Sequence, residues 1–365
     1  MGTQNFAAPK LLVVVDTEEE FDWEQPFSRR ATDVSHMRYL DRAQQIFQRY
    51  AIKPTYVIDY SIASQEQGYR PLREWLDAGL CTIGAHLHPW VNPPHDEELC
   101  AYNSYPGNLP KALERAKLAC LTEVIERNIG RRPIVYRAGR YGMGASTGEI
   151  LEELGYVVDT SVVPRTAFRD DGGPDFTAFD NRPFWFGPSS GVLEIPLTVG
   201  WCGRLKSRGD ALQPFLMSRL GSRLRLRALF ARLGLFERIR LTPEGNDFSE
   251  MKRLTDTMLA AGTRLFVFSY HSPSVVPGNT PYVRNEGDLR RFLGLIDKFC
   301  EYFVEICSGE GITPEEARTL FANSEPHAGV EVSSVSGQGI GDSLLSGDRG
   351  PAVIGAAPHP IEFAR

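Results

Sequence analysis

The sequence lacks a leader-like or membrane-spanning segment and has no excess of basic residues. The apolar run near its start, Leu11 to Val15, has five residues, whereas a membrane-spanning helix needs about 20. Acidic residues number 46 against 40 basic ones, for a net charge of −6. Nucleic-acid-binding proteins normally carry a basic excess, so we expect no nucleic-acid partner. The absence of an export-like segment predicts a cytoplasmic protein.

Cysteine and histidine are both scarce. The chain has six cysteines and seven histidines among 365 residues, and no two cysteines form a CxxC motif. Reduced thiols are therefore expected rather than a disulfide framework. Apolar residues make up 42% of the chain and charged residues 24%, which is typical of a globular protein with a sizeable core. The last 42 residues, 324–365, hold seven Gly, six Ser and four Pro, and this composition predicts a disordered tail.

Short strand-like runs alternate with longer helical patterns. This alternation predicts parallel strands joined by helical crossovers, in a barrel or an open sheet. Helices are expected at Ser35–Tyr50, Leu109–Ile129 and Ser146–Leu154, and a capping box of Ser146 and Glu149 is predicted to start the third. Seven strands are expected, one fewer than in the common eight-stranded barrel: Leu11–Asp16, Pro54–Asp59, Cys81–His88, Pro133–Gly139, Tyr156–Ser161, Val192–Leu197 and Arg264–His271.

A basic segment runs from Arg204 to Arg240 and contains ten bases against two acids. Leucine and phenylalanine residues spaced through it give the segment a broad apolar face. A basic amphipathic helix of this kind favours contact with an anionic lipid surface or another anionic ligand. The alternative is a helix that packs on the barrel and turns its basic face to solvent.

Carboxylates and histidines collect where predicted strands end. Asp16 and Glu18 are two residues apart, so in an extended chain they point to the same side. His86 and His88 have the same spacing, and two histidines with a carboxylate suit a divalent metal. The sequence thus predicts a metal site at the edge where such barrels gather catalytic groups. A plain acidic loop and a chance histidine pair are the alternatives.

Two further strand ends carry groups suited to catalysis. Arg137 ends the fourth predicted strand, where a buried guanidinium needs a carboxylate partner. The glycines that follow it, starting at Gly139, allow a tight turn whose backbone N–H groups can hold an oxyanion. His271 ends the seventh strand and suits proton transfer, because the imidazole pKa lies near neutral pH.

Taken together, these blocks resemble the polysaccharide deacetylase superfamily, that is, the NodB homology domain of carbohydrate esterase family 4. The matching blocks stand in order over residues 10–310: Asp16, His86, Arg137, Asp159 in Asp-Thr-Ser, and His271. The resemblance implies a distorted (β/α)7 barrel in residues 1–323. It also implies metal-dependent hydrolysis of an N-acetyl group on an amino sugar, a polysaccharide or a glycan precursor.

The resemblance also implies roles for individual residues. Glu18, His86 and His88 would hold the metal, which is expected to be zinc, with cobalt, nickel or manganese as alternatives. A metal-bound water would be the nucleophile and Asp16 the general base.

Arg137 would keep Asp16 ionised, and the backbone N–H near Tyr141 would help to bind the oxyanion. His271 would be the general acid, with Asp159 as its orienting partner. The side chains expected to contact the substrate are Trp90, Arg140 and Tyr270; the aromatic rings can stack on sugar faces or serve as barrel packing.

The sequence departs from the family pattern in three places. Thr17 stands where the family has a second aspartate, so the carboxylate ligand must be Glu18 or Glu19. Trp90 stands where the family's second histidine would fall, which leaves His88 or His95 to replace it.

In the third place, Gly139 and Arg140 stand where the family usually carries Pro before an aromatic residue. These changes mark either a divergent subgroup, which we favour, or a barrel that has lost its metal. The alternatives to a deacetylase are therefore a non-catalytic carbohydrate-binding relative and a metal-dependent amidase that acts on another substrate.

Overall fold

The computed structural model describes residues 6–217, 223 and 226–323 of the chain. The predicted tail, 324–365, and part of the basic segment lie outside these residues. Within the described part, no helix is long and apolar enough to cross a membrane. All six cysteines are free thiols.

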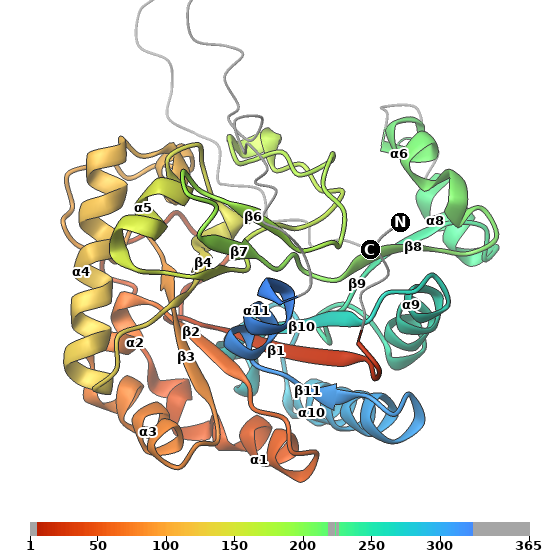
Figure 1. Ribbon diagram of the computed structural model, residues 1–365, viewed down its shortest axis with the longest axis horizontal. Helices are drawn as coiled ribbons and strands as arrows, with labels where there is room; N and C mark the ends of the chain where they lie inside the picture. The colour runs from red at the N-terminus through yellow and green to blue at the C-terminus, as the bar shows by residue number, and fades with distance from the viewer. Residues whose placement is uncertain (1–5, 218–222, 224–225, 324–365) are drawn as a thin grey trace, which may run out of the picture.

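A curled, mostly parallel sheet forms the centre of the molecule (Figure 1). Each of the seven predicted strands is present, in the spatial order β10-β1-β2-β3-β4-β5-β7. Their bounds are β10 Leu265–His271, β1 Lys10–Thr17, β2 Thr55–Ile58, β3 Thr82–Leu87, β4 Val135–Ala138, β5 Val158–Asp159 and β7 Val192–Glu194. The antiparallel strand β6 (Phe184–Phe186) follows β7 at one edge, and the short β11 (Glu310–Gly311) pairs with β1.

The two sides of the curled sheet are joined by irregular chain rather than by a further ladder among the described strands. The backbone N–H of Leu241 donates to the Thr198 carbonyl over 2.9 Å, and that of Ser269 on β10 donates to the Leu241 carbonyl over 3.3 Å. The Thr198 hydroxyl accepts from the Val267 N–H at 2.8 Å. The prediction of a distorted seven-stranded (β/α) barrel is confirmed.

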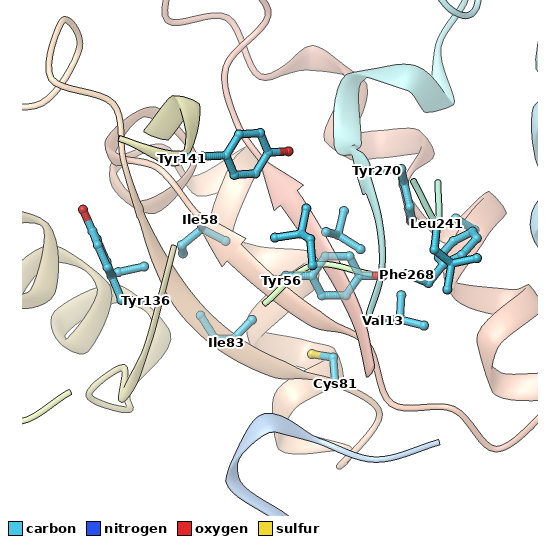
Figure 2. Packing of buried hydrophobic residues seen from close by; sticks show 14 of the residues in the cluster. Val13, Tyr56, Ile58, Cys81, Ile83, Tyr136, Tyr141, Leu241, Phe268 and Tyr270 are labelled. Atoms are coloured by element: carbon cyan, nitrogen blue, oxygen red, sulfur yellow. The ribbon is translucent and has the colours of Figure 1, made fainter. Parts of the chain in front are cut away.

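Alternation along the strands separates two apolar clusters. Leu11, Val13 and Val15 of β1 belong to a large outer cluster that packs under the helices, part of which Figure 2 shows. Leu12 and Val14 belong to a smaller inner cluster. Because successive side chains of a strand face opposite sides, Asp16 and Glu18 continue the inner row of β1.

Helices cover the outer face of the sheet. Their bounds are α1 Asp41–Arg49, α2 Tyr60–Ser64, α3 Glu66–Asp77, α4 Lys111–Ile129, α5 Thr147–Leu154, α9 Phe248–Ala260 and α10 Glu286–Glu301. The last helix, α11 (Pro314–Ala322), places Ala317 in the inner cluster instead and begins with a capping box of Thr313 and Glu316. The capping box predicted at Ser146 is wrong, because the Ser146 side chain caps nothing and Glu149 pairs with Lys111.

The basic segment is not one long helix. Its described parts form α6 (Gly209–Met217), α8 (Leu226–Arg232) and the strand β9 (Glu237–Arg240), which pairs with β8 (Val199–Cys202). These two helices stand apart from the barrel at the upper right of Figure 1. A small apolar cluster around Trp201 and Phe236 packs them against the antiparallel pair of β8 and β9.

Candidate active site

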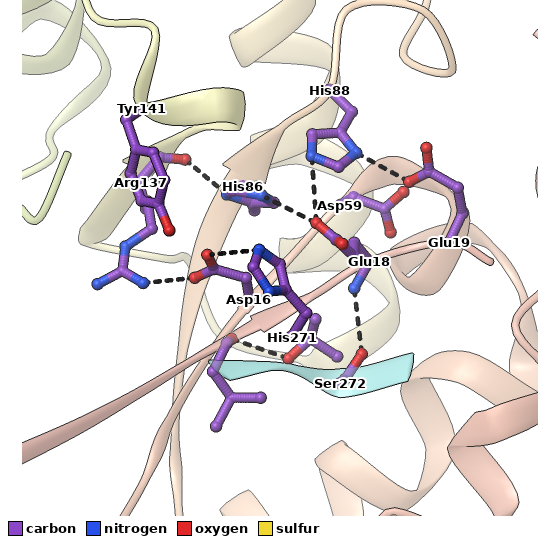
Figure 3. A network of polar contacts seen from close by, with 12 residues as sticks. Asp16, Glu18, Glu19, Asp59, His86, His88, Arg137, Tyr141, His271 and Ser272 are labelled. Atoms are coloured by element: carbon purple, nitrogen blue, oxygen red, sulfur yellow. Dashed lines mark hydrogen bonds and ion pairs between the residues drawn. The ribbon is translucent and has the colours of Figure 1, made fainter. Parts of the chain in front are cut away.

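Polar side chains from four strands meet at the C-terminal edge of the sheet (Figure 3). Asp16 and Glu18 come from the end of β1, His86 and His88 from β3, Arg137 from β4 and His271 from β10. All six are less than a tenth exposed. A pocket opens beside them, and its lining residues are Asp16, Glu18, Phe21, Trp23, Phe27, His86, His88, Trp90, Arg140, Tyr141 and His271.

The first half of the site, which we call the Glu18 half, consists of Glu18, His86 and His88. Nε2 of His86 lies 3.5 Å from Oε2 of Glu18, and Nε2 of His88 lies 3.4 Å from the same oxygen. The three donor atoms lie within 4.8 Å of one another. The predicted ligand set is therefore brought together. His95, the other candidate, is exposed and belongs to neither ligand group found among the described residues.

Each imidazole of the Glu18 half is held by its other ring nitrogen. Nδ1 of His86 lies 3.0 Å from the Arg137 carbonyl oxygen, which can only accept, so this nitrogen carries the proton. Nδ1 of His88 lies 2.9 Å from Oε2 of Glu19. Both Nε2 atoms thus face Glu18 as potential ligands.

Burial sets the protonation of the Glu18 half. It lowers the pKa of His86 to about 3 and that of His88 to about 4, so both rings are neutral at pH 7 and their nitrogens can bind a cation. Burial, and then the nearby charges of Glu19 and Asp16, raise the pKa of Glu18 well above its usual range. A carboxyl group and two neutral imidazoles in this arrangement form a donor set that favours a divalent cation.

The second half, which we call the Asp16 half, begins with an ion pair. Nη1 of Arg137 donates to Oδ1 of Asp16 at 2.5 Å, and its Nε donates to the carbonyl and hydroxyl oxygens of Thr160, each at 3.0 Å. Burial opposes ionisation of Asp16, but the Arg137 guanidinium beside it outweighs burial and lowers the pKa of Asp16 to about 2. Asp16 is therefore a carboxylate throughout the neutral range.

His271 completes the Asp16 half together with a residue that the sequence analysis missed. Nε2 of His271 lies 3.7 Å from Oδ2 of Asp16, and its Nδ1 lies 2.8 Å from Oε2 of Glu244. The other Glu244 oxygen accepts from the backbone N–H of His271 and from the Ser274 hydroxyl. Glu244 lies in the loop after β9, and the only signal for it in the sequence is an acidic residue in a Pro-Glu-Gly turn.

The prediction that Asp159 orients His271 is wrong. Asp159 accepts hydrogen bonds from its neighbours Thr160 and Ser161. On β5, Val158 belongs to the inner cluster, so alternation turns Asp159 to the other face, beside Glu194, its partner across the β5–β7 pair. Burial raises the pKa of both carboxyl groups.

The same alternation contradicts one of the three expected substrate contacts. Tyr270 lies between Ser269 and His271 on β10 and therefore points to the outer cluster. There its ring packs 5.5 Å from that of Phe292, centre to centre, and is 1% exposed. Figure 2 shows Tyr270 beside Phe268 in this packing.

The other expected contacts, Trp90 and Arg140, do line the pocket, together with Tyr141. Arg140 and Tyr141 have positive φ angles of 54° and 60°, which are uncommon for residues other than glycine. The Arg140 guanidinium lies over the Tyr105 ring and pairs with Asp171. The Tyr141 hydroxyl accepts a hydrogen bond from Arg240.

Comparison with known proteins shows the fold. No protein-family model matches the sequence, and no curated protein matches it. Among solved structures, an assigned glycoside hydrolase/deacetylase from Parabacteroides distasonis is 13% identical with a TM-score of 0.56, over 88% of this chain and 73% of that one. PuuE allantoinase is 15% identical with a TM-score of 0.50, over 90% and 96%. An assigned polysaccharide deacetylase from Mycobacterium smegmatis is 17% identical with a TM-score of 0.48, over 89% and 95%.

These similarities, at low identity, concern the fold and not the reaction. The described chain shares its (β/α) barrel-type fold with the Parabacteroides distasonis protein and with PuuE allantoinase. Any reaction that this chain catalyses must be inferred from the side chains of its pocket.

Proposed function

We propose that the protein is a divergent, metal-dependent deacetylase that removes N-acetyl groups from an amino sugar, a polysaccharide or a glycan precursor. One observation carries the proposal: a potential metal-ligand set, Glu18 with His86 and His88, lies beside an ionised carboxylate and an oriented imidazole in one pocket. Hydrolysis of an unactivated amide needs an electrophile, a base and an acid, and these groups are suited to supply each of them.

The residues present fit a divalent cation. Oε1 of Glu18 is buried and has no hydrogen-bond partner, and the two imidazoles that face Glu18 have their Nδ1 atoms occupied by other groups. Zinc is the proposed ion because imidazole and carboxylate ligands suit it, while cobalt, nickel and manganese are the alternatives. When bound, such a cation supplies a Lewis acid that polarises the amide carbonyl and lowers the pKa of water.

The chain's own groups then divide the proton transfers. Asp16, held ionised by Arg137, takes the proton of the attacking water. Nε2 of His271 gives a proton to the leaving amine, and Glu244 orients the ring by accepting from Nδ1. The backbone N–H of Tyr141 is proposed to hold the oxyanion, while Trp90 and Arg140 in the pocket wall contact the sugar.

A second candidate is hydrolysis of another amide, including a cyclic one. The similarity of the fold to PuuE allantoinase supports it, as does the aromatic pocket wall formed by Phe21, Trp23, Phe27 and Trp90. A non-catalytic carbohydrate-binding role receives less support. A binding role does not explain why a buried Asp16–Arg137 pair lies beside a Glu244–His271 pair, with Nε2 of His271 3.7 Å from Oδ2 of Asp16.

The deciding experiment measures acetate release from a panel of N-acetylated monosaccharides, oligosaccharides and nucleotide-linked sugars, with cyclic and simple amides in parallel. The proposal predicts acetate from at least one sugar and no turnover of the other amides. Turnover of a cyclic amide without acetate from any sugar would support the second candidate.

We also propose that the basic segment makes a weak contact with an anionic lipid surface. Arg204, Lys206 and Arg208 are exposed, and Leu229 and Leu233 of this region are 49% and 58% exposed. Basic side chains beside exposed apolar ones favour adsorption to an anionic bilayer. The contact would bring a lipid-linked sugar toward the barrel.

A further inference from the structure

The surroundings of His88 explain how a histidine two residues after His86 can serve as a ligand. We propose that Glu19 is a positioning residue that fixes His88 for metal binding, with Trp90 locking Glu19 in place. The inference rests on the proposed metal site, and it concerns residues to which neither the comparisons nor the resemblance assigns a role of this kind.

Glu19 contacts the His88 ring at Nδ1, the nitrogen that does not face Glu18. Its Oε2 lies 2.9 Å from Nδ1 of His88, on the far side of the ring from Nε2, which faces Glu18. The Glu19 side chain is fully buried, and it is absent from the pocket lining. It therefore meets the ligand without meeting the substrate. A carboxylate in this place holds the Nδ1–H tautomer and makes Nε2 a stronger donor.

Trp90 fixes the pair from a second direction. Its indole N–H donates to Oε1 of Glu19 at 2.6 Å, and its ring stacks on His88 with centres 4.2 Å apart. One residue thus holds both the carboxylate and the imidazole. Trp90 stands where the second histidine of the resembled family would fall, and here it supports a ligand instead of being one.

Gly139 makes room for this arrangement. A Cβ atom at this position would lie 2.6 Å from Cδ2 of His88 and 2.3 Å from the Leu87 carbonyl oxygen. No side chain fits there, so the His88 ring occupies space that any larger residue at 139 would take. The departures from the family pattern at positions 88, 90 and 139 therefore belong to one arrangement, in which His88 is packed and oriented by its neighbours.

A second ligand group shares His88 and offers a competing explanation. Glu19, Asp59 and His88 place donor atoms within 4.8 Å of one another, so Glu19 would be a direct ligand if a second ion bound there. Both oxygens of Glu19 already have partners, Oε1 the Trp90 indole N–H and Oε2 Nδ1 of His88, whereas in Asp59 only Oδ1 is occupied, by the Ile62 N–H that it caps. We therefore assign Glu19 to orientation, which predicts one ion per chain.

The test measures zinc binding directly, by competition with a chromogenic chelator, on the full chain stripped of metal and dialysed. For E19Q we expect one ion per chain at saturation with about 10- to 100-fold weaker affinity, the usual effect of removing such a supporting group. The amide is a poorer acceptor, and its NH2 group can donate to Nδ1 and move the proton to Nε2. For W90F, which keeps one aromatic ring beside His88 but removes the N–H together with the second ring of the indole, we expect a smaller loss in the same direction.

Glu114→Gln is the matched control, because Glu114 is also a buried carboxyl group but contacts Thr147 and no site residue. Its affinity should equal that of the wild type, and circular dichroism should show that all variants are folded. Unchanged affinity in both E19Q and W90F would overturn the inference, as would two ions in the wild type and one in E19Q. No binding by the wild type would instead overturn the proposed function on which it rests.

Discussion

The two halves of the pocket place similar side chains in different electrostatic settings. In the Asp16 half, the chain supplies its own cation, Arg137, and the pKa of Asp16 falls to about 2 despite burial. In the Glu18 half, Oε2 of Glu18 faces the Nε2 atoms of two imidazoles, His86 and His88, at 3.5 and 3.4 Å. Burial keeps both imidazoles neutral, and the pKa of Glu18 rises.

The difference indicates a division of labour. The Asp16 half holds a permanent carboxylate and an oriented imidazole, which are the parts needed for proton transfer. The Glu18 half holds neutral nitrogens and a carboxyl group, which are the parts needed to bind a cation. Each half has one imidazole that is backed by a glutamate, His271 by Glu244 and His88 by Glu19.

The largest expected effect comes from the Asp16 half. In D16N the amide cannot take the proton of water, so kcat should fall on the order of 10³-fold, within the range of general acid–base contributions. Zinc should still bind with one ion per chain, because the Glu18 half is intact. Acetate release and metal content measure the two effects. The control is D22N, an exposed neighbour on the same loop, and retained activity in D16N would refute its role as base.

Replacing Glu244 tests the orientation of His271, the imidazole of the Asp16 half. In E244Q the imidazole loses its carboxylate, and kcat should fall on the order of 10²-fold with KM and zinc affinity unchanged. D159N is the comparison, since Asp159 is buried but turned away from His271. It should change activity per folded molecule far less than E244Q does. Equal losses in the two variants would show that Glu244 has no special place in the reaction.

Glu114 shows what burial does to a carboxyl group that has neither an arginine nor an imidazole beside it. Burial raises its pKa from 4.5 to about 8, although the Thr147 hydrogen bond opposes this. The folded state therefore holds a proton that the unfolded chain releases above pH 4.5, so this group's contribution to stability is lost as the pH rises from about 5 to about 8.

E114Q removes that pH-dependent loss. Urea unfolding should show the variant gaining stability relative to the wild type between pH 5 and pH 8. The amide oxygen can still accept from Thr147, so the two proteins should differ less at pH 5. A constant difference across this range would mean that Glu114 is ionised in the folded protein.

The smallest expected effect concerns the basic segment. Binding to vesicles of mixed neutral and anionic lipid should weaken as salt rises, because the attraction is screened. R208Q should weaken it by about 1 kcal/mol, the usual contribution of one basic residue at such a surface, and K53Q, exposed elsewhere, should leave it unchanged. Binding that is independent of salt would contradict the proposed contact.

The strand pattern predicted most of the fold, because β-branched runs and helical spacing are local properties. It also brought Asp16, Glu18, His86 and His88 together, since residues two apart on a strand share a face. That same rule, applied to Asp159 and Tyr270, would have placed both on the outer face. The prediction for Asp159 followed the resemblance, and that for Tyr270 followed its position near the end of a strand. Neither took the alternation of side chains into account.

Glu244 and Glu19 were harder to place from the sequence. Glu244 lies in an irregular loop whose path depends on how Thr198 and Leu241 join the two sides of the curled sheet. The contact between Glu19 and His88 depends on side-chain packing around Trp90. Contacts of this kind depend on tertiary structure, and neither spacing nor composition reports them.

The central claim is that Glu18, His86 and His88 bind one divalent cation. Its most direct test is equilibrium dialysis of the metal-stripped chain against zinc, with E18Q alongside as a variant of nearly unchanged size. The account predicts one ion per wild-type chain and at least a hundredfold weaker binding by E18Q, about 2.8 kcal/mol at 1.4 kcal/mol per tenfold. No ion in the wild type, or equal affinity in both proteins, would contradict it.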